Sequence, residues 1–315
     1  MTVTSLWLCN RRWFQPSVAA HQPFAADADK EISGTVGKWR NLDEEEGEKV
    51  LKVKSWFVFA FIGVVFTGWG LHQIFVIPTY DDHWVWLTTG NAEIVDYIKF
   101  RFQNHGIWTA ANGMFIMLAA LTGFRKRELW AWGAMAYVPV HIILLTTQFY
   151  WLFFITIPLV LMAAWALWVT RRQLQPRTSN RRGGGWLVLF AFGLLFLYFA
   201  YDNFFVVPAL DVHDPDRGWA WLTTDPEIIA YIKLYFRVFG IRVFGFAMLT
   251  LLTAIYGLRE GYRSAWKPLW LIPLLLLVHL LLWPWPSYIP ILIVLALLAG
   301  LGLWWAYPKV DGVES

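Results

Sequence analysis

Long apolar segments alternate with short polar segments along most of the chain. A membrane-spanning helix needs about 17–25 mostly apolar residues to cross the hydrocarbon core of a bilayer. Eight segments are of this kind, and they lie near 56–77, 106–124, 129–148, 150–169, 186–207, 239–257, 267–283 and 287–306. The pattern therefore predicts an all-α integral membrane protein with eight transmembrane helices and no inserted soluble domain.

The segment between the first two spans recurs between the fifth and sixth. Residues 81–106 and 211–240 share, in the same order, an Asp-x-His pair, the sequence Trp-x-Trp-Leu-Thr-Thr and later Glu, Tyr, Lys and Gly residues. Matches continue through the other spans, for example Trp132 with Trp266. Such similarity within one chain indicates an internal repeat. We therefore predict a tandem duplication of a four-helix unit, and because each unit has an even number of spans, both copies have the same orientation.

Lysine and arginine residues gather at alternate ends of the spans. They occur just before the first span, at 125–127, throughout 171–182, at 259–267 and at Lys309. Cytoplasmic loops of membrane proteins carry an excess of these residues. We therefore expect both the N and C termini to be cytoplasmic and the two repeated segments to face outward, in a multi-pass protein of the cell (inner) membrane.

These patterns divide the chain into five parts. A capped helix start near Asn41 indicates an interfacial helix just before the first span. The expected parts are an N-terminal cytoplasmic arm with this helix (1–54), the first four-helix unit (55–170), a basic cytoplasmic linker (171–185), the second four-helix unit (186–307) and a C-terminal tail (308–315).

The composition excludes several classes of protein and partner. The chain is 58% hydrophobic and only 15% charged, which is more apolar surface than a soluble domain covers. Its net charge is +4, but the basic residues lie beside the spans, where membrane orientation explains them. We therefore expect the lipid bilayer, and no nucleic acid, as a partner. Cys9 is the only cysteine, so the chain has no intrachain disulfide and no thiolate metal site.

The Asp-x-His pair of each repeated segment is one candidate for chemistry. It comprises Asp81 and His83 in the first copy and Asp211 and His213 in the second. A carboxylate beside an imidazole can orient a proton acceptor or contribute to a metal site. A metal needs a third ligand, which the repeat does not supply in both copies, so no metal site is predicted. A rim of paired charges at the membrane surface explains the same residues without a function.

Charged residues inside two spans are a second candidate. Asp202 and Arg242 lie in the outer parts of the fifth and sixth spans, and charges at this depth usually face a partner or a cavity. Their matched residues in the first copy are His72 and Trp108, so both members of the pair differ together. We therefore predict that Asp202 and Arg242 form an ion pair, which either ties two helices together or faces a ligand. Their matched polar neighbours, also candidates for ligand binding, are Gln73 and Asn203.

Two histidines lie inside the third and seventh spans, each after a proline. They are His141, after Pro139, and His279, after Pro273. Haem ligation would require the two rings to meet across the bundle, and nothing else in the sequence marks a haem site. A hydrogen bond to a carbonyl that the proline leaves free is the favoured interpretation.

The sequence leaves three functions open and assigns no cofactor. It contains no Walker loop, no Gly-x-Ser-x-Gly motif and no His-Glu-x-x-His motif. The leading hypothesis is a non-enzymatic protein that binds or passes a small or hydrophobic molecule through an outward-facing polar mouth between the first two spans of each unit. The alternatives are a structural or accessory subunit that contacts other membrane subunits, and a membrane enzyme that uses Asp-x-His for acid and base chemistry. A binder predicts a cavity near His72 or Asp202, whereas a scaffold predicts a filled core.

Overall fold

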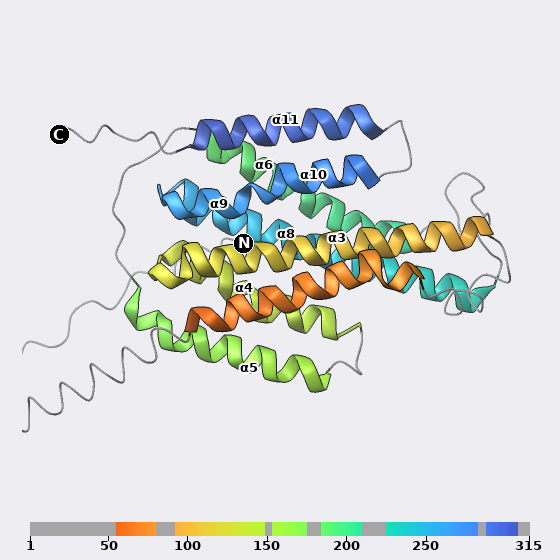
Figure 1. Ribbon diagram of the computed structural model, residues 1–315, viewed down its shortest axis with the longest axis horizontal. Helices are drawn as coiled ribbons and strands as arrows, with labels where there is room; N and C mark the ends of the chain where they lie inside the picture. The colour runs from red at the N-terminus through yellow and green to blue at the C-terminus, as the bar shows by residue number, and fades with distance from the viewer. Residues whose placement is uncertain are drawn as a thin grey trace, which may run out of the picture. The chain divides into compact units, whose positions relative to one another are not determined.

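The computed structural model describes residues 55–79, 92–148, 153–174, 184–209, 225–282 and 288–307, which all belong to one compact unit. Nearly all of these residues are helical, and none of them forms a strand. Among them, eight helices are long and apolar enough to cross a membrane: Ser55–Thr79, Lys99–Lys126, Leu129–Thr146, Phe153–Gln173, Gly185–Ala209, Pro226–Leu258, Arg263–Leu282 and Ile289–Ala306 (Figure 1). The predicted all-helical, polytopic membrane protein is confirmed at this level.

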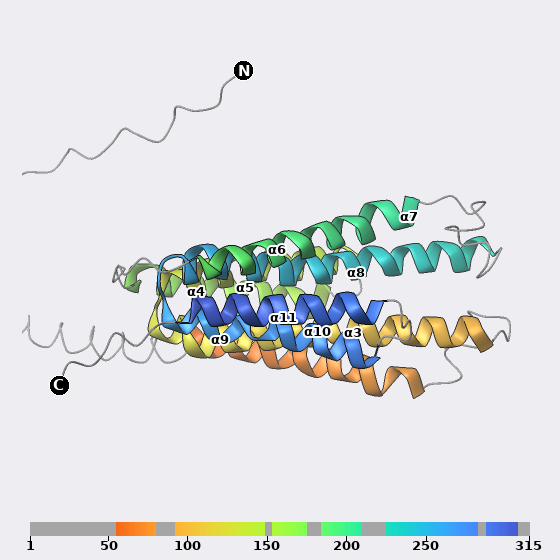
Figure 2. The same cartoon turned by 90° about the horizontal axis from the view of Figure 1, so that it is seen from above.

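Two long helices, α3 (Ala92–Thr122) and α8 (Pro226–Thr253), form the centre of the bundle and pack on each other. Each begins in the polar sequence before its span and continues without a break, as predicted for the first of them. Asp225 caps α8 by accepting a hydrogen bond from the Glu227 amide at 2.9 Å. Both helices extend beyond most of their neighbours at the end where they begin (Figure 2). We call this end the projecting end.

The remaining helices surround this central pair. They are α4 (Leu129–Thr146), α5 (Phe153–Thr170), α6 (Gly185–Tyr201), the π-helical turn η5 (Asp202–Val206), α7 (Val207–Ala209), α9 (Trp266–Leu269), α10 (Leu271–Leu282) and α11 (Ile289–Ala306). The third span of each half packs on the second span of the other half, because α4 lies on α8 while α9 and α10 lie on α3. The halves are therefore joined through the same pair of central helices.

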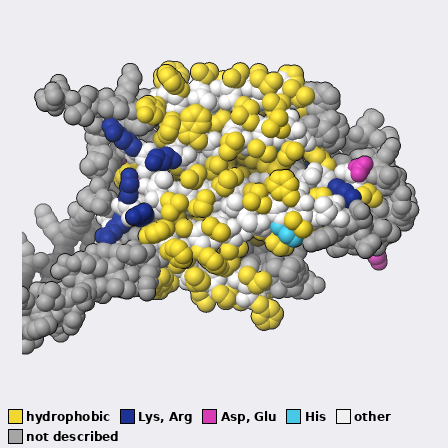
Figure 3. All heavy atoms as spheres, in the orientation of Figure 1, with side chains coloured by type: hydrophobic (Ala, Val, Ile, Leu, Met, Phe, Trp, Pro, Cys, Tyr) yellow, Lys and Arg dark blue, Asp and Glu magenta, His cyan; other side chains and the backbone are white. Residues whose placement is uncertain are grey.

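The outer helices leave much of their apolar surface exposed. The first span (Ser55–Thr79), α5 and α11 are mostly exposed, whereas α3 and α8 are mostly buried. Apolar side chains cover the middle of the face shown in Figure 3, and lysine and arginine gather at the end opposite the projecting end. We call that end the basic end. Its described lysines and arginines include Arg125, Lys126, Arg171, Arg172, Arg259, Arg263 and Lys267. An apolar girdle with a charged end is the surface that lipid requires.

Backbones approach most closely between the first span and α3. A Cβ atom built on Gly70 would lie 2.4 Å from the Ala110 amide nitrogen, and one built on Gly106 would lie 2.6 Å from the Gly70 carbonyl oxygen. Only glycine fits at such contacts, which are common where membrane helices associate. By contrast, nothing lies within 4 Å of a Cβ atom at Gly68.

Aromatic rings fill the centre where α3, α6 and α8 meet. The Trp108 ring packs edge-on against Phe196 at 5.4 Å and Phe246 at 5.6 Å between ring centroids. Edge-to-face contacts of this kind are favourable beyond the area that they bury. These rings therefore fill the middle of the bundle, where the three helices meet.

Candidate functional site: a buried polar layer

A group of buried polar side chains lies between the central helices, toward the projecting end. We call it the polar layer, and it consists of Gln73, Asn104, His105, Thr109, Asn112, His141, Arg242 and His279, all at most 7% exposed. His141 lies five residues before the end of α4 at Thr146, and His279 lies three residues before the end of α10 at Leu282. With a helical rise of about 1.5 Å per residue, the layer lies roughly 5–8 Å below the ends of these helices. It is therefore inside the span of the bundle.

Arg242 is the centre of the layer. Its Nη1 donates a hydrogen bond to Oε1 of Gln73, on the first span, at 2.8 Å. The Thr109 hydroxyl donates to the same oxygen at 3.4 Å. Asn112 donates to the Arg242 carbonyl at 2.8 Å and to the Trp108 carbonyl at 2.9 Å. The first span, α3 and α8 are thus linked by side-chain hydrogen bonds around one guanidinium group.

The predicted ion pair between Arg242 and Asp202 is wrong. Among the described residues no carboxylate pairs with Arg242, and its Nε is buried without a hydrogen-bond partner. Asp202 lies half-buried on η5, whereas its neighbour Asn203 is buried and donates to the Phe199 carbonyl at 2.8 Å. Consecutive helical residues point about 100° apart, so Asn203 faces inward and Asp202 does not. Arg242 reaches across to the first half of the chain instead of to the helix that precedes its own.

His279 links α10 to α3. Its Nε2 lies 2.9 Å from Oδ1 of Asn104, and its Nδ1 lies 2.8 Å from the Leu275 carbonyl oxygen. A neutral imidazole donates only one hydrogen, so a neutral His279 that donates from Nδ1 to Leu275 requires the Asn104 amide to be turned, with its nitrogen toward Nε2. Pro273 leaves the carbonyl of Leu269 free, because it removes the donor to the residue four before it. The predicted type of bond, histidine to backbone carbonyl, is present, but the carbonyl is a different one.

His141 has no hydrogen-bond partner at either ring nitrogen, although it is 1% exposed. Its ring lies between Phe66 and Tyr137, each at 5.9 Å between centroids, and a Cβ atom on Gly245 would lie 2.3 Å from Cε1 of the ring. The glycine on α8 therefore makes room for the imidazole of α4. The bond from His141 to a free carbonyl, which the sequence predicted, is absent.

Other buried polar atoms around Arg242 are also without partners. They are Nδ1 of His105, Nε1 of Trp108, Oδ1 of Asn112 and the hydroxyl groups of Tyr137 and Tyr235. Each such atom costs about 1–3 kcal/mol when it is left unpaired in a dry interior. Native proteins therefore place water or a ligand against such groups. A concentration of them around a single cation identifies this layer as the candidate site.

The charge of the layer is positive. Arg242 is the only lysine, arginine, aspartate or glutamate among its members, and the His105 ring lies 3.8 Å from the Tyr235 ring between centroids. Arg101 lies above it on α3, with its guanidinium 4.6 Å from the centre of the Phe236 ring. An acidic or strongly accepting group is the chemical complement of such a site.

Two of the other predicted site residues that the structure describes, His72 and Asp202, are not part of this layer. The His72 ring is half-buried and stacks on Trp69 at 5.5 Å between centroids, whereas its neighbour Gln73 accepts the hydrogen bond from Arg242. The residues of the two Asp-x-His pairs, Asp81, His83, Asp211 and His213, lie outside the described residues. In the described part of the chain no three His, Cys, Asp or Glu side chains lie together as a metal site requires.

Sequence reasoning missed the amides and hydroxyls of α3. Asn104, Thr109 and Asn112 are buried in an otherwise apolar helix. Polar residues of this kind inside a span are themselves a signal of a partner or a cavity. A search restricted to charged residues overlooks them.

Comparisons of the chain with models of protein families, with curated proteins and with solved structures find no match.

Proposed function

We propose that this polytopic membrane protein is a non-enzymatic binder of a small molecule that carries a carboxylate or a similar acidic group. The observation that carries the proposal is Arg242, a cation inside the bundle that no described carboxylate neutralises. A buried charge without a counter-charge costs several kcal/mol. An acidic ligand would remove that cost, and this gives the ligand its binding energy.

The unpartnered groups define what kind of ligand is complementary. Nε of Arg242 and Nε1 of Trp108 can only donate, and the hydroxyl groups of Tyr137 and Tyr235 can donate as well. A site rich in donors suits a ligand rich in acceptors. The Phe239 ring lies next to His105 and the Phe66 ring lies next to His141. These apolar rings suit an apolar body attached to the acidic group. Short organic acids have both properties.

We further propose that the bundle is a tandem duplication whose two units have the same orientation. Contacts between matched residues support this. The Trp132 indole donates to the Leu167 carbonyl at 3.1 Å, and the Trp266 indole donates to the Leu303 carbonyl at 2.9 Å. Arg125 lies over the Trp56 ring at 5.4 Å and Arg259 lies over the Trp186 ring at 5.5 Å. The matched tryptophans thus each donate to a carbonyl of the last span of their own half, and the matched arginines each lie over a matched tryptophan, which is what a duplicated unit predicts.

The basic end supports the proposed topology. Cytoplasmic loops are rich in lysine and arginine, so the basic end would face the cytoplasm, and both termini would lie there, in the cell membrane. The projecting end and the polar layer would then face outward. The ligand would arrive from this side, because the layer lies within one to two helical turns of it.

A thermal shift experiment tests the proposed function. The full-length protein is purified in a neutral detergent and titrated with hexanoate, and with methyl hexanoate as the uncharged control. We expect hexanoate to raise the melting temperature by several degrees and the ester to have little effect, since a ligand that binds only the folded state stabilises it by about 2.7 kcal/mol at a hundred times its Kd.

The variant Arg242→Gln is the matched test of the site. It removes the cation but keeps a group that can hydrogen-bond to Gln73, so the fold should persist. We expect the response to hexanoate to disappear in this variant. An equal response of Arg242→Gln and the parent protein, or no response to any acid from acetate to octanoate, would contradict the proposal.

A further inference from the structure

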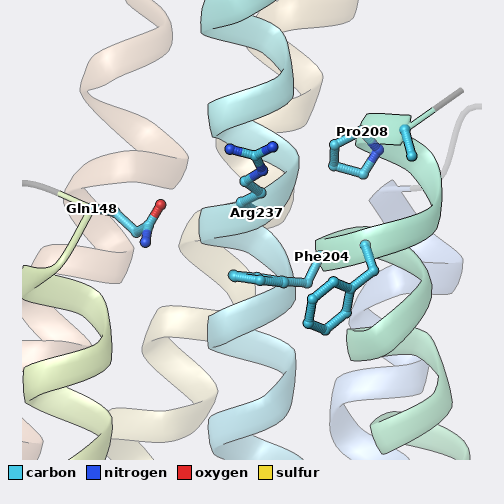
Figure 4. A pocket seen from close by; sticks show the side chains of 6 residues that line it. Gln148, Phe204, Pro208 and Arg237 are labelled. Atoms are coloured by element: carbon cyan, nitrogen blue, oxygen red, sulfur yellow. The ribbon is translucent and has the colours of Figure 1, made fainter. Parts of the chain in front are cut away.

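A groove separate from the polar layer lies toward the projecting end, where α8, η5 and α7 of the second half meet the end of α4. It has a volume of about 270 Å³ and is lined by Gln148, Phe204, Phe205, Pro208, Ala209 and Arg237. Figure 4 shows Arg237 on α8 between Gln148, which follows α4, and Phe204 and Pro208, which belong to η5 and α7. None of the polar-layer residues lines it.

The groove combines one cation with apolar walls. Arg237 is exposed, and no described residue forms an ion pair or a hydrogen bond with its side chain. The Phe204 and Phe205 rings pack edge-on at 4.7 Å between centroids, and Phe205 is 58% exposed. A guanidinium forms two parallel hydrogen bonds to a phosphate, and exposed aromatic rings suit acyl chains. The groove therefore has the chemistry of a site for a phosphate group that carries a hydrocarbon chain.

The depth of the groove fits a lipid headgroup. Gln148 lies two residues after the end of α4 at Thr146, and Ala209 is the last residue of α7. These are the ends of spans, where the headgroup region of a bilayer begins. Arg237 is thus placed at the level of lipid phosphates. Phe204 and Phe205 lie in η5, which precedes α7 in the chain, and are therefore closer to the bilayer interior than Ala209.

Two differences between matched residues distinguish the second-half helices that line the groove from their first-half counterparts. Sequence matching aligns Arg237 with Gln103, so the first half has no cation at this position. It also aligns Phe204 with Ile74, in a part of the first span that is α-helical, whereas Phe204 lies in the wider π-helical turn η5. π-helical turns inside helices are frequent at functional sites.

We propose that this groove binds an anionic glycerophospholipid from the leaflet at the projecting end, with its phosphate on Arg237 and its acyl chains along Phe204 and Phe205. No described carboxylate lines the groove, so no anionic side chain there pairs with the ammonium of a zwitterionic headgroup. The amide of Gln148 can instead bond to a headgroup hydroxyl. Phosphatidylglycerol has the required phosphate, hydroxyl groups and net negative charge.

Native mass spectrometry of the full-length protein tests this site. The detergent-purified protein is titrated with phosphatidylglycerol, phosphatidylcholine or inorganic phosphate, and the bound fraction is measured. We expect phosphatidylglycerol to bind more tightly than phosphatidylcholine, and Arg237→Gln to weaken its binding about tenfold, since a charge-assisted contact of this type is lost. The control Arg172→Gln, at the basic end, should leave the affinity unchanged.

Two further measurements distinguish a lipid phosphate from free phosphate, and the lipid site from the acid site at Arg242. Inorganic phosphate should not compete at concentrations that exceed those of the lipid tenfold, because it lacks the chains that contact the phenylalanines. Arg242→Gln should bind phosphatidylglycerol as the parent protein does, so failure of the proposed acid site would not affect this result. Unchanged binding in Arg237→Gln, equal binding of the zwitterionic lipid, or full competition by inorganic phosphate would overturn the lipid site.

Discussion

Leucine in place of Gly70 is expected to prevent the first span from packing on α3. A Cβ atom at this position already lies 2.4 Å from the Ala110 amide nitrogen and 2.6 Å from the Gly106 carbonyl oxygen, and both are backbone atoms that cannot move aside. Overpacking a core by a few methylene groups costs about 1–3 kcal/mol, and forcing two backbones apart costs more. The variant should lose most of its folded yield from membranes and melt well below the parent protein in fluorescence-detected size-exclusion chromatography.

The change Gly68→Leu is the matched control for this experiment. Gly68 lies two residues away on the same helix, on an exposed face where nothing lies within 4 Å of a Cβ atom. The same leucine should therefore leave folded yield and melting temperature nearly unchanged. Equal loss in both variants would show that leucine harms the first span for a reason other than contact with α3.

Glutamate in place of Gln73 is expected to supply internally the carboxylate that Arg242 lacks. The glutamine oxygen already accepts a hydrogen bond from Nη1 of Arg242 at 2.8 Å, so the new carboxylate needs no rearrangement to form an ion pair. A hydrogen bond to a charged group stabilises a folded protein by about 1.5–3 kcal/mol. We expect the ligand-free variant to melt at a higher temperature and to lose its response to hexanoate, because its cation is already neutralised.

The change Asn203→Asp provides the contrast. Asn203 is matched with Gln73 by sequence and is also buried, but its amide donates to the Phe199 carbonyl. A carboxylate there loses that bond and meets no described cation, so the same replacement of an amide by an acid should lower the melting temperature. Differential scanning fluorimetry measures the change in melting temperature of each variant, which should be positive for Gln73→Glu and negative for Asn203→Asp. A lower melting temperature for Gln73→Glu would contradict the view that Arg242 lacks a counter-charge.

Span number and position could be predicted from the sequence because they depend on local composition. The first span was predicted at 56–77 and extends over Ser55–Thr79. Its length and apolarity are set by the thickness of the hydrocarbon core, which is the same for every helix. The second span was harder to delimit. Its helix already begins at Ala92, whereas the apolar run begins only after Lys99 and Arg101. The extent of a helix and the extent of its apolar segment are different properties. Only the extent of the apolar segment can be read directly from composition.

The partner of Arg242 could not be predicted in the same way. The sequence indicates which residues are at similar depth, but a helix has several neighbours at each depth. Arg242 meets Gln73 of the first span because the central helices α3 and α8 join the two halves. The π-helical turn at Asp202–Val206, which contains both Asp202 and Asn203, has no recognised signature in sequence. Both features depend on tertiary packing.

Identification of small molecules that remain bound through purification tests the central claim most directly. The full-length protein and Arg242→Gln are purified in parallel from the same membranes, denatured, and their extracts compared by mass spectrometry. We predict that an organic acid is present in the parent extract at close to one molecule per chain and is strongly depleted in the variant. Equal amounts of every acid in the two extracts, or no acid in either, would contradict the role of Arg242 as the centre of an acid-binding site.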